Sequence, residues 1–344
     1  MKSIKFPEDE LAHDCIIEWW YINGHLLGDD GNRYSFMDCL FKAKVKEVEI
    51  PFLSKIPLKT MYFSHSIISD IDSKKFYPTI DYLSIVSRDS FTKPLLFVNY
   101  TNPIFMNGYV NSVIEETELF NYHIKTEDMD LTMKSMKEPL LEGGTGFVNL
   151  GSKGSYYYSL TNLKTEGVIK VGDRNVKVSG KSWIDHQWAD VKYSKDQWTW
   201  FSIQLDNDTE MVCYEYTDVK TNNKSYLASI SRSNGMQEHT EEVIIAPLTK
   251  KWTSPKTKNT YVLSWRIEVP SWNMWFEVES MIDDQEMVFG TINYWEGPLS
   301  VHGEIDKKPV KGHGFMELLG RPSHYANVGV IKDYVTKVTR QWIS

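Results

Sequence analysis

Short apolar and aromatic stretches recur along the whole chain, and runs rich in glycine, asparagine and aspartate separate them. Such runs favour tight turns, because these residues tolerate the backbone angles that a chain reversal requires. Strands joined by short turns pair in an antiparallel way, so the chain is predicted to be an all-β protein with barrel or sandwich architecture. The clearest turn runs are Gly28-Asp29-Asp30-Gly31-Asn32, Gly151-Ser152-Lys153-Gly154, Gly172-Asp173-Arg174-Asn175 and Asp206-Asn207-Asp208.

Individual elements follow from the same pattern. Apolar residues alternate on both sides of the turn at 172–175, which predicts a hairpin. The run 211–216 is apolar enough for a strand that is buried on both faces. Only two stretches suggest helices, residues 109–119 and the C-terminal region from Val328.

The length of 344 residues is too great for one ordinary barrel and suits two domains. We therefore predict an N-terminal barrel over 1–192 and a C-terminal barrel over 193–344, because the Trp-rich segments recur on each side of that point. The 12 tryptophans and 19 tyrosines favour strands and supply rigid walls for an apolar pocket.

Charge and cysteine content exclude several classes of protein. A net charge of -8 disfavours nucleic acid as a partner, because phosphate binding requires clustered lysine and arginine. The three cysteines are far apart and form no disulfide pattern, which fits a reducing compartment. No apolar run resembles a signal peptide or a membrane span, so we expect a cytoplasmic protein.

The segment 18–26, Glu-Trp-Trp-Tyr-Ile-Asn-Gly-His-Leu, concentrates functional groups. On a strand, Glu18 and Trp20 share one face, while Trp19 and Tyr21 share the other. A carboxyl group beside indole rings is poorly solvated, which raises its pKa and leaves it able to donate a proton near pH 7. The alternative is that the aromatic side chains are core residues and that Glu18 pairs with a buried arginine or a backbone amide.

The segment 185–188, Asp-His-Gln-Trp, forms a second candidate group. His186 and Trp188 share a face of the expected strand, and Asp185 lies on the opposite face. Histidine exchanges protons near pH 7, and it can accelerate a reaction when it lies within hydrogen-bonding reach of the substrate. A structural histidine bonded to a loop carbonyl is the alternative.

Other catalytic patterns are lacking. The nine histidines show no HExxH motif and no close His/Cys spacing, so no metal site is predicted. The chain also lacks a GxSxG elbow, a phosphate-binding GxxxxGK[ST] loop and a strand-helix GxGxxG, which removes support for serine hydrolase, nucleotide hydrolase and dinucleotide enzymes. Further carboxyl groups lie among aromatic residues, and each has a structural alternative: Glu215, Asp218, Glu296 and Glu317.

Several motifs, in order, are similar to those of the carotenoid 1,2-hydratase (hydroxyneurosporene synthase) and AttH-like lipocalin family, which is related to kievitone hydratase and to fungal lipocalin-like Diels-Alderases. The resemblance covers nearly the whole chain. It rests on His13 with residues 18–26, Ser64-His65, 155–159, 178–188, 198–205, 252–254, Gln285-Glu286, 294–297 and 312–318.

This resemblance implies two lipocalin-like antiparallel β-barrel domains with an apolar ligand at or between them. In the hydratases it implies acid-catalysed addition of water to an isoprenoid double bond, with a carbocation that aromatic faces stabilise. The catalytic candidates are Asp185, His186, Asp218 and Glu18. The ligand-binding candidates are Trp19, Trp20, Tyr21, His25, His65, Tyr157, Trp188, Trp200, Tyr214, Tyr216, Trp295 and Glu296.

Two functions stay open from the sequence. One is a cofactor-independent acid–base enzyme that hydrates, isomerises or cyclises an isoprenoid or polyketide-like molecule. The other is a carrier that binds a lipid or terpenoid without chemistry. Both have an apolar small molecule as partner, and the sequence does not indicate the oligomeric state.

Overall fold

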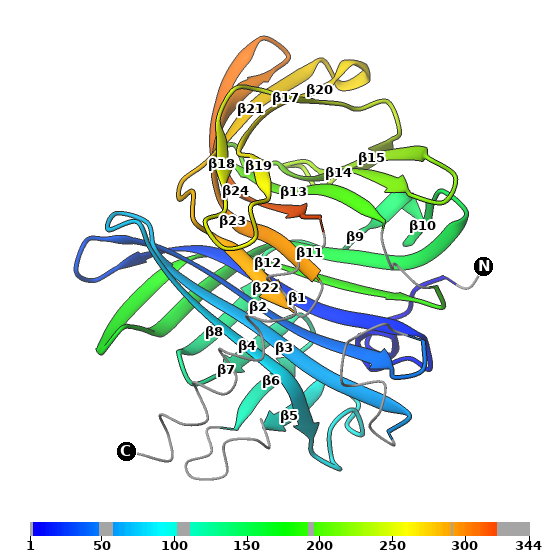
Figure 1. Ribbon diagram of the computed structural model, residues 1–344, viewed down its shortest axis with the longest axis vertical. Coiled ribbons are helices and arrows are strands. Elements are labelled where there is room, and N and C mark those ends of the chain that lie inside the picture. The colour runs from blue at the N-terminus through cyan, green and yellow to red at the C-terminus, as the bar shows by residue number, and fades with distance from the viewer. Residues whose placement is uncertain (1–2, 48–57, 102–110, 192–195, 290–291, 322–344) are drawn as a thin grey trace.

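The computed structural model describes residues 3–47, 58–101, 111–191, 196–289 and 292–321. Two large sheets and one hairpin make up most of these ranges, which confirms the all-β class (Figure 1). No helix in the described part of the chain is long and apolar enough to cross a membrane. The helical elements described are the short 3-10 turns η1 (Glu8–Glu10), η3 (Glu142–Gly144) and η4 (Pro270–Trp272).

The first sheet closes into a barrel of ten antiparallel strands, because its last strand, β8, pairs back with β11. Two short strands, β9 (Leu140–Leu141) and β10 (Phe147–Leu150), pair with β11 beside the ring. The ring consists of β1 (Ile17–Gly28), β2 (Arg33–Lys44), β3 (Thr60–Asp70), β4 (Lys75–Val86), β5 (Phe97–Thr101), β6 (Ser112–Glu118), β7 (Asn121–Lys125), β8 (Met129–Ser135), β11 (Lys153–Val171) and β12 (Arg174–Ala189).

The second sheet is a curled half-barrel that stays open, with β16 and β17 at its two edges. A separate hairpin joins β18 (Lys251–Thr253) to β19 (Thr260–Val262). The predicted domain boundary at 192/193 lies outside the described residues. The sheet contains β13 (Gln197–Leu205), β14 (Glu210–Asp218), β15 (Asn223–Ser231), β16 (Gln237–Thr240), β17 (Ile244–Pro247), β20 (Ser264–Val269), β21 (Met274–Ser280), β22 (Glu286–Phe289), β23 (Ile292–Ile305) and β24 (Lys308–Leu319).

The outer face of the barrel packs against the second sheet, with β24 beside β1 and β23 beside β2 (Figure 1). Side chains alternate between the two faces of a strand, so neighbouring residues enter different cores. Trp20 and Ile184 lie in the apolar core inside the barrel. Tyr21 and Trp183 lie in the core between the barrel and the second sheet. The face assignments predicted for both strands are therefore confirmed.

The hairpin predicted around residues 172–175 is confirmed, since Val171 pairs with Arg174 and Gly172 has a φ of 61°. The strand predicted at 211–216 is also confirmed as part of β14. The helix predicted from residue 109 is wrong, because Ser112–Glu118 is the strand β6. Pairing with β5 and β7 on both sides overrides the helical preference of its glutamates. The stretch from Val328 lies outside the described residues.

We expect Gly180→Ala to lower the free energy of unfolding by about 3 kcal/mol, the upper end of the usual cost of overpacking. A Cβ at this position would lie 2.0 Å from the backbone oxygen of His25 on the neighbouring strand. Urea unfolding measures the loss. Ser179→Ala, at the adjacent exposed position, is the control and should change stability little. Equal stability of the two variants would contradict the close approach.

Candidate functional site

Strand β12 carries Asp185 and His186 on opposite faces, and each belongs to a separate buried group of polar side chains. His186 points into the barrel end at which β1 begins and β12 ends. Asp185 points toward the second sheet, where Tyr157 and Trp183 also lie. We call these groups the barrel-end cluster and the interface cluster. Two residues adjacent in the sequence thus have different chemical surroundings.

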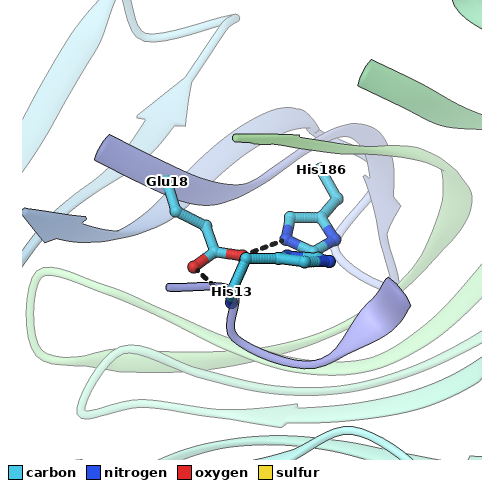
Figure 2. A group of neighbouring side chains, drawn as sticks. All are labelled: His13, Glu18 and His186. Atoms are coloured by element: carbon cyan, nitrogen blue, oxygen red, sulfur yellow. Dashed lines mark hydrogen bonds and ion pairs between the residues drawn. The ribbon is translucent and has the colours of Figure 1, made fainter. Parts of the chain in front are cut away.

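The barrel-end cluster consists of His13, Glu18, Lys42 and His186, with Glu18 at its centre. Figure 2 shows Glu18 with the two histidines. Oε1 of Glu18 lies 2.7 Å from Nδ1 of His13 and 3.1 Å from Nε2 of His186. Oε2 of Glu18 accepts a hydrogen bond from Nζ of Lys42 at 2.8 Å. Both oxygens of this carboxyl group therefore have a close partner, an imidazole or an ammonium group.

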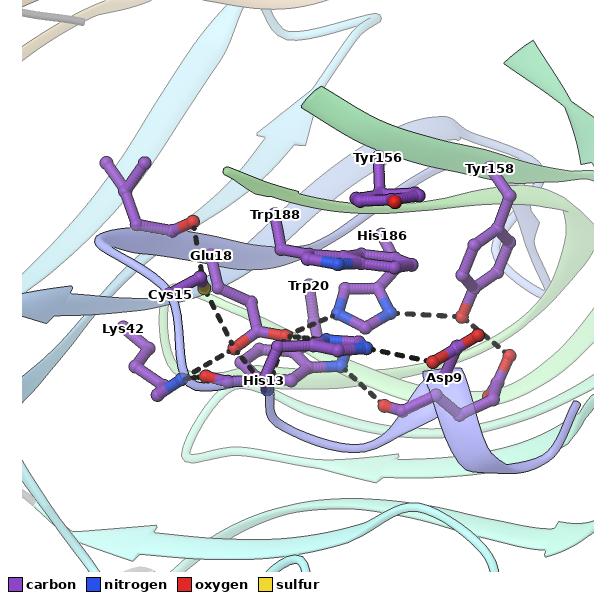
Figure 3. A network of polar contacts seen from close by, with 12 residues as sticks. Asp9, His13, Cys15, Glu18, Trp20, Lys42, Tyr156, Tyr158, His186 and Trp188 are labelled. Carbon is purple, nitrogen blue, oxygen red and sulfur yellow. Dashed lines mark hydrogen bonds and ion pairs between the residues drawn. The ribbon is translucent and has the colours of Figure 1, made fainter. Parts of the chain in front are cut away.

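Aromatic rings hold both imidazoles in place (Figure 3). Trp188 stacks on His13 with ring centroids 3.9 Å apart and an interplanar angle of 5°. Trp20 stacks on His186 at 4.8 Å and donates its indole N–H to the carbonyl of Glu10. These two tryptophans, predicted as ligand-binding residues, thus pack against the histidines of the cluster.

The contacts of Glu18 decide its ionisation. Burial by itself raises its pKa, but the hydrogen bonds with His13 and His186, together with the charges of His186 and Lys42, outweigh burial and lower the pKa to about 2. Of the two alternatives for Glu18, the contacts support the paired one. Its partners are the backbone amide and the ring of His13 and the ammonium group of Lys42 on β2, rather than an arginine. Glu18 is a carboxylate at neutral pH.

Glu10, which no motif in the sequence singles out, enters the same barrel end from the N-terminal turn η1. The phenol groups of Tyr122 and Tyr158 donate to its two oxygens at 2.5 and 2.7 Å. Burial and the charge of Glu116 raise the pKa of Glu10 to about 8. The acidic run at residues 8–10 looks like a solvent-exposed segment, so no local signal indicates this role.

The interface cluster contains Asp185, which three donors surround. The hydroxyl groups of Tyr157 and Ser159 and the indole of Trp183 each donate to its carboxyl oxygens at 2.6 Å. Burial raises the pKa of Asp185 to about 6, while these three hydrogen bonds oppose the rise. Asp185 therefore has a fixed orientation and is mainly ionised at pH 7.

The interface cluster also contains two facing carboxyl groups, Glu296 and Glu317, which are cross-strand neighbours on β23 and β24. Tyr21 donates to Glu296 at 2.7 Å, and Trp198 donates to Glu317 at 2.6 Å. The two carboxyl groups are within hydrogen-bonding reach of each other. Burial raises the pKa of Glu317 to about 7, and burial together with the charge of Glu317 raises that of Glu296 well above its usual value. The pair therefore retains a proton near neutral pH.

The raised pKa of Glu317 makes stability depend on pH. Its pKa is about 7 in the folded protein and near 4.5 in the unfolded chain, so its protonated form contributes stability below pH 4.5. This contribution of roughly 3 kcal/mol is lost as the pH rises through 7. When the pH is raised from 5 to 8, the free energy of unfolding should fall less in Glu317→Gln than in the unchanged protein. Urea unfolding at both pH values measures this fall. The exposed Glu166→Gln should not differ from the unchanged protein, and parallel curves for all three would contradict this prediction.

The other predicted residues lie in several places. Trp200, Tyr214 and Tyr216 belong to the interface core, against which the half-buried Trp19 packs. His65 is hydrogen-bonded to Tyr294 of the second sheet, and Nε2 of His25 lies 2.8 Å from the carbonyl oxygen of Gly314. Trp295 lies in the core of the second sheet and donates to the carbonyl of Asp283.

Asp218 lies at the end of β14 and outside both clusters. It accepts hydrogen bonds from the hydroxyl of Ser152 and from the backbone amide of Lys220, both at 2.9 Å. These contacts are those of a residue that caps a turn. The structure does not bring Asp218 to the other catalytic candidates.

An open pocket of about 980 Å³ lies at the other end of the barrel, where β1 ends and β12 begins. Leu27, Met129, Ile169 and Val178 supply its apolar lining. None of its lining residues belongs to either cluster, so the predicted ligand-binding residues do not line it.

Comparison with known proteins identifies relatives of this chain. It is 27% identical over 203 residues to kievitone hydratase of Fusarium solani subsp. phaseoli, a match covering 55% of this chain and 56% of that protein. It is 24% identical over 204 residues to the dehydratase asqC of Emericella nidulans, a match covering 55% of this chain and 57% of that protein. The matches thus span little more than half of these curated relatives.

The fold is also found in a solved structure. The crystal structure of a putative AttH protein from Nitrosomonas europaea superposes with a TM-score of 0.73 at 22% identity, covering 93% of this chain and 98% of that one. The model of the AttH-like family matches residues 1–321. The chain belongs to the AttH-like family.

Proposed function

We propose that the protein is a cofactor-independent acid–base enzyme that hydrates, isomerises or cyclises at a double bond of a small, largely apolar molecule. We place the reaction at the interface cluster, between the barrel and the second sheet. The observation that carries this proposal is the facing pair of carboxyl groups, the fully buried Glu296 and the partly buried Glu317. A carboxyl group that keeps its proton near pH 7 in apolar surroundings is a suitable general acid.

The pair supplies the proton in this mechanism. Transfer from Glu317 to the double bond leaves a cation on the neighbouring carbon, and water then attacks that carbon in a hydration. Faces of Tyr and Trp stabilise such a cation by about 0.5–2 kcal/mol each. Tyr157, Trp200 and Tyr294 of the interface core are available for this role.

Asp185 has the complementary role of a base. Its three hydrogen bonds favour the ionised form and hold the carboxylate in one orientation. An ionised carboxylate can accept a proton from attacking water, whereas the protonated pair donates one. Asp185 is therefore proposed as the base rather than as the acid.

Some buried polar atoms near the interface cluster have no hydrogen-bond partner. Among the described residues, Nδ2 of Asn23, Nε2 of His65 and Oε2 of Glu142 are buried without a hydrogen-bond partner. Buried polar atoms are normally paired, by protein groups, water or a ligand. These atoms support a substrate that carries oxygen functions next to its apolar part.

The names of two relatives, a hydratase and a dehydratase, support water addition or removal as the reaction class. To test it, the protein is incubated in ¹⁸O-labelled water with a panel of terpenoid and polyketide-like alkenes, and products are analysed by mass spectrometry. A gain or loss of one water, or an isomer of unchanged mass, supports the proposal. Tight binding without any product would instead favour the carrier function.

A further inference from the structure

Three side chains that commonly bind metal ions meet in the barrel-end cluster. One ring nitrogen each of His13 and His186 and one carboxylate oxygen of Glu18 all lie within 4.8 Å of one another (Figure 2). The nitrogens that face Glu18 are Nδ1 of His13 and Nε2 of His186. His13 and Glu18 are five residues apart, whereas His186 comes from a distant strand. No sequence motif therefore indicates the group.

The far nitrogen of each imidazole has its own partner (Figure 3). Nε2 of His13 lies 3.2 Å from Oδ1 of Asp9, and Nδ1 of His186 lies 3.2 Å from the hydroxyl of Tyr158. Histidines that bind metals almost always donate their other N–H to such an oxygen, which fixes the ring and its tautomer. In both rings, the far nitrogen can thus carry the proton, and the nitrogen that faces Glu18 can bind a metal ion.

The two spacings from Glu18 require only a small adjustment. A tetrahedral ion with bonds of 2.0–2.1 Å separates its ligand atoms by about 3.4 Å. The present separations from Oε1 of Glu18 are 2.7 Å to His13 and 3.1 Å to His186. The side chain of His13 is 21% exposed, which gives an ion a path from solvent.

The charge of Lys42 should weaken the binding of a metal ion to this cluster. Its ammonium group holds Oε2 of Glu18, so Oε1 is left for the imidazoles. The positive charge of Lys42 repels a second cation at this place. If a metal ion binds, removal of this charge should strengthen its binding.

We propose that the barrel-end cluster binds one divalent transition-metal ion through His13, Glu18 and His186, with a fourth position open to water. Two imidazoles and one carboxylate suit Zn²⁺, and three protein ligands with one open position are typical of catalytic rather than structural zinc. This site is separate from the interface cluster and does not depend on the function proposed there.

The full-length protein, freed of metal by a chelator that is then removed, is titrated with Zn²⁺ alone in competition with a chromophoric chelator. We expect one equivalent to bind, about 100-fold more weakly in His13→Ala and about 10-fold more weakly in Asp9→Asn, which removes the outer partner. Lys42→Met should bind at least about tenfold more tightly. Co²⁺ alone should give the visible absorption of a four-coordinate ion in the unchanged protein and not in His13→Ala.

His123→Ala is the matched control, because it removes another histidine–carboxylate contact, that with Asp130 at 2.8 Å. Its affinity for Zn²⁺ should equal that of the unchanged protein. Thermal unfolding confirms that each variant is folded, and Asp9→Asn provides the test if His13→Ala is not. Absence of stoichiometric Zn²⁺ binding, equal affinity in all variants, or weaker binding by Lys42→Met would overturn the proposal.

Discussion

Replacing Glu317 with glutamine is expected to reduce turnover by roughly 10²–10⁴-fold, the usual contribution of a general acid. Glutamine has nearly the same shape and can still accept the hydrogen bond from Trp198. It cannot transfer a proton to the substrate. Single-turnover product formation measures the loss, and ligand affinity should stay within about tenfold because binding does not require the acidic proton.

Asp38→Asn is the matched control for this experiment. The side chain of Asp38 is buried, and burial raises its pKa to about 7, the value to which the pKa of Glu317 is also raised. It lies on the opposite face of β2 from Cys39, which belongs to the interface core. A similar loss in Asp38→Asn would show that any buried carboxyl group produces the effect, and the assignment of Glu317 as the acid would then be wrong.

Replacing Glu18 with glutamine is expected to lower the free energy of unfolding of the metal-free protein by about 3–5 kcal/mol, the cost of breaking a buried ion pair. The side chain of Glu18 is fully buried, and that of Lys42 is only 10% exposed. Without the carboxylate, the ammonium of Lys42 keeps the carbonyl of His13 as a partner but loses its counter-charge. Chemical denaturation followed by tryptophan fluorescence measures the change.

An exposed ion pair serves as the comparison. Glu215→Gln breaks the contact with Lys224 at 2.7 Å, where the lysine side chain is 51% exposed. Solvent screens such a pair, so its loss should cost less than about 1 kcal/mol. Equal small losses in both variants would mean that Glu18 does not stabilise the barrel end.

The sequence predicted most of the architecture. Turn runs and period-two alternation are local features, and they indicated the all-β class and the hairpin at 172–175 correctly. The same alternation placed Asp185 and His186 on opposite faces. The stretch from Ser112 shows the limit of local preference, since neighbouring strands on both sides made it a strand rather than a helix.

The candidate site was only partly predictable. The segments at 18–21 and 185–188 do lie side by side, in register from Glu18 with Trp188 to Tyr21 with Asp185. Their partners come from elsewhere: Lys42 on β2, Glu10 on η1 and Glu296 on β23. No spacing in the sequence links these residues, because strand pairing and the packing of the second sheet bring them together.

The sequence by itself thus determined which side chains share a face, since that depends only on the alternation of a strand. The tertiary structure alone decided which charges those faces meet. Ionisation depends on burial and on neighbours within a few ångströms, so Glu18 became a carboxylate beside Lys42, while Glu317 became an acid beside Glu296. Identical side chains acquired opposite protonation states for that reason.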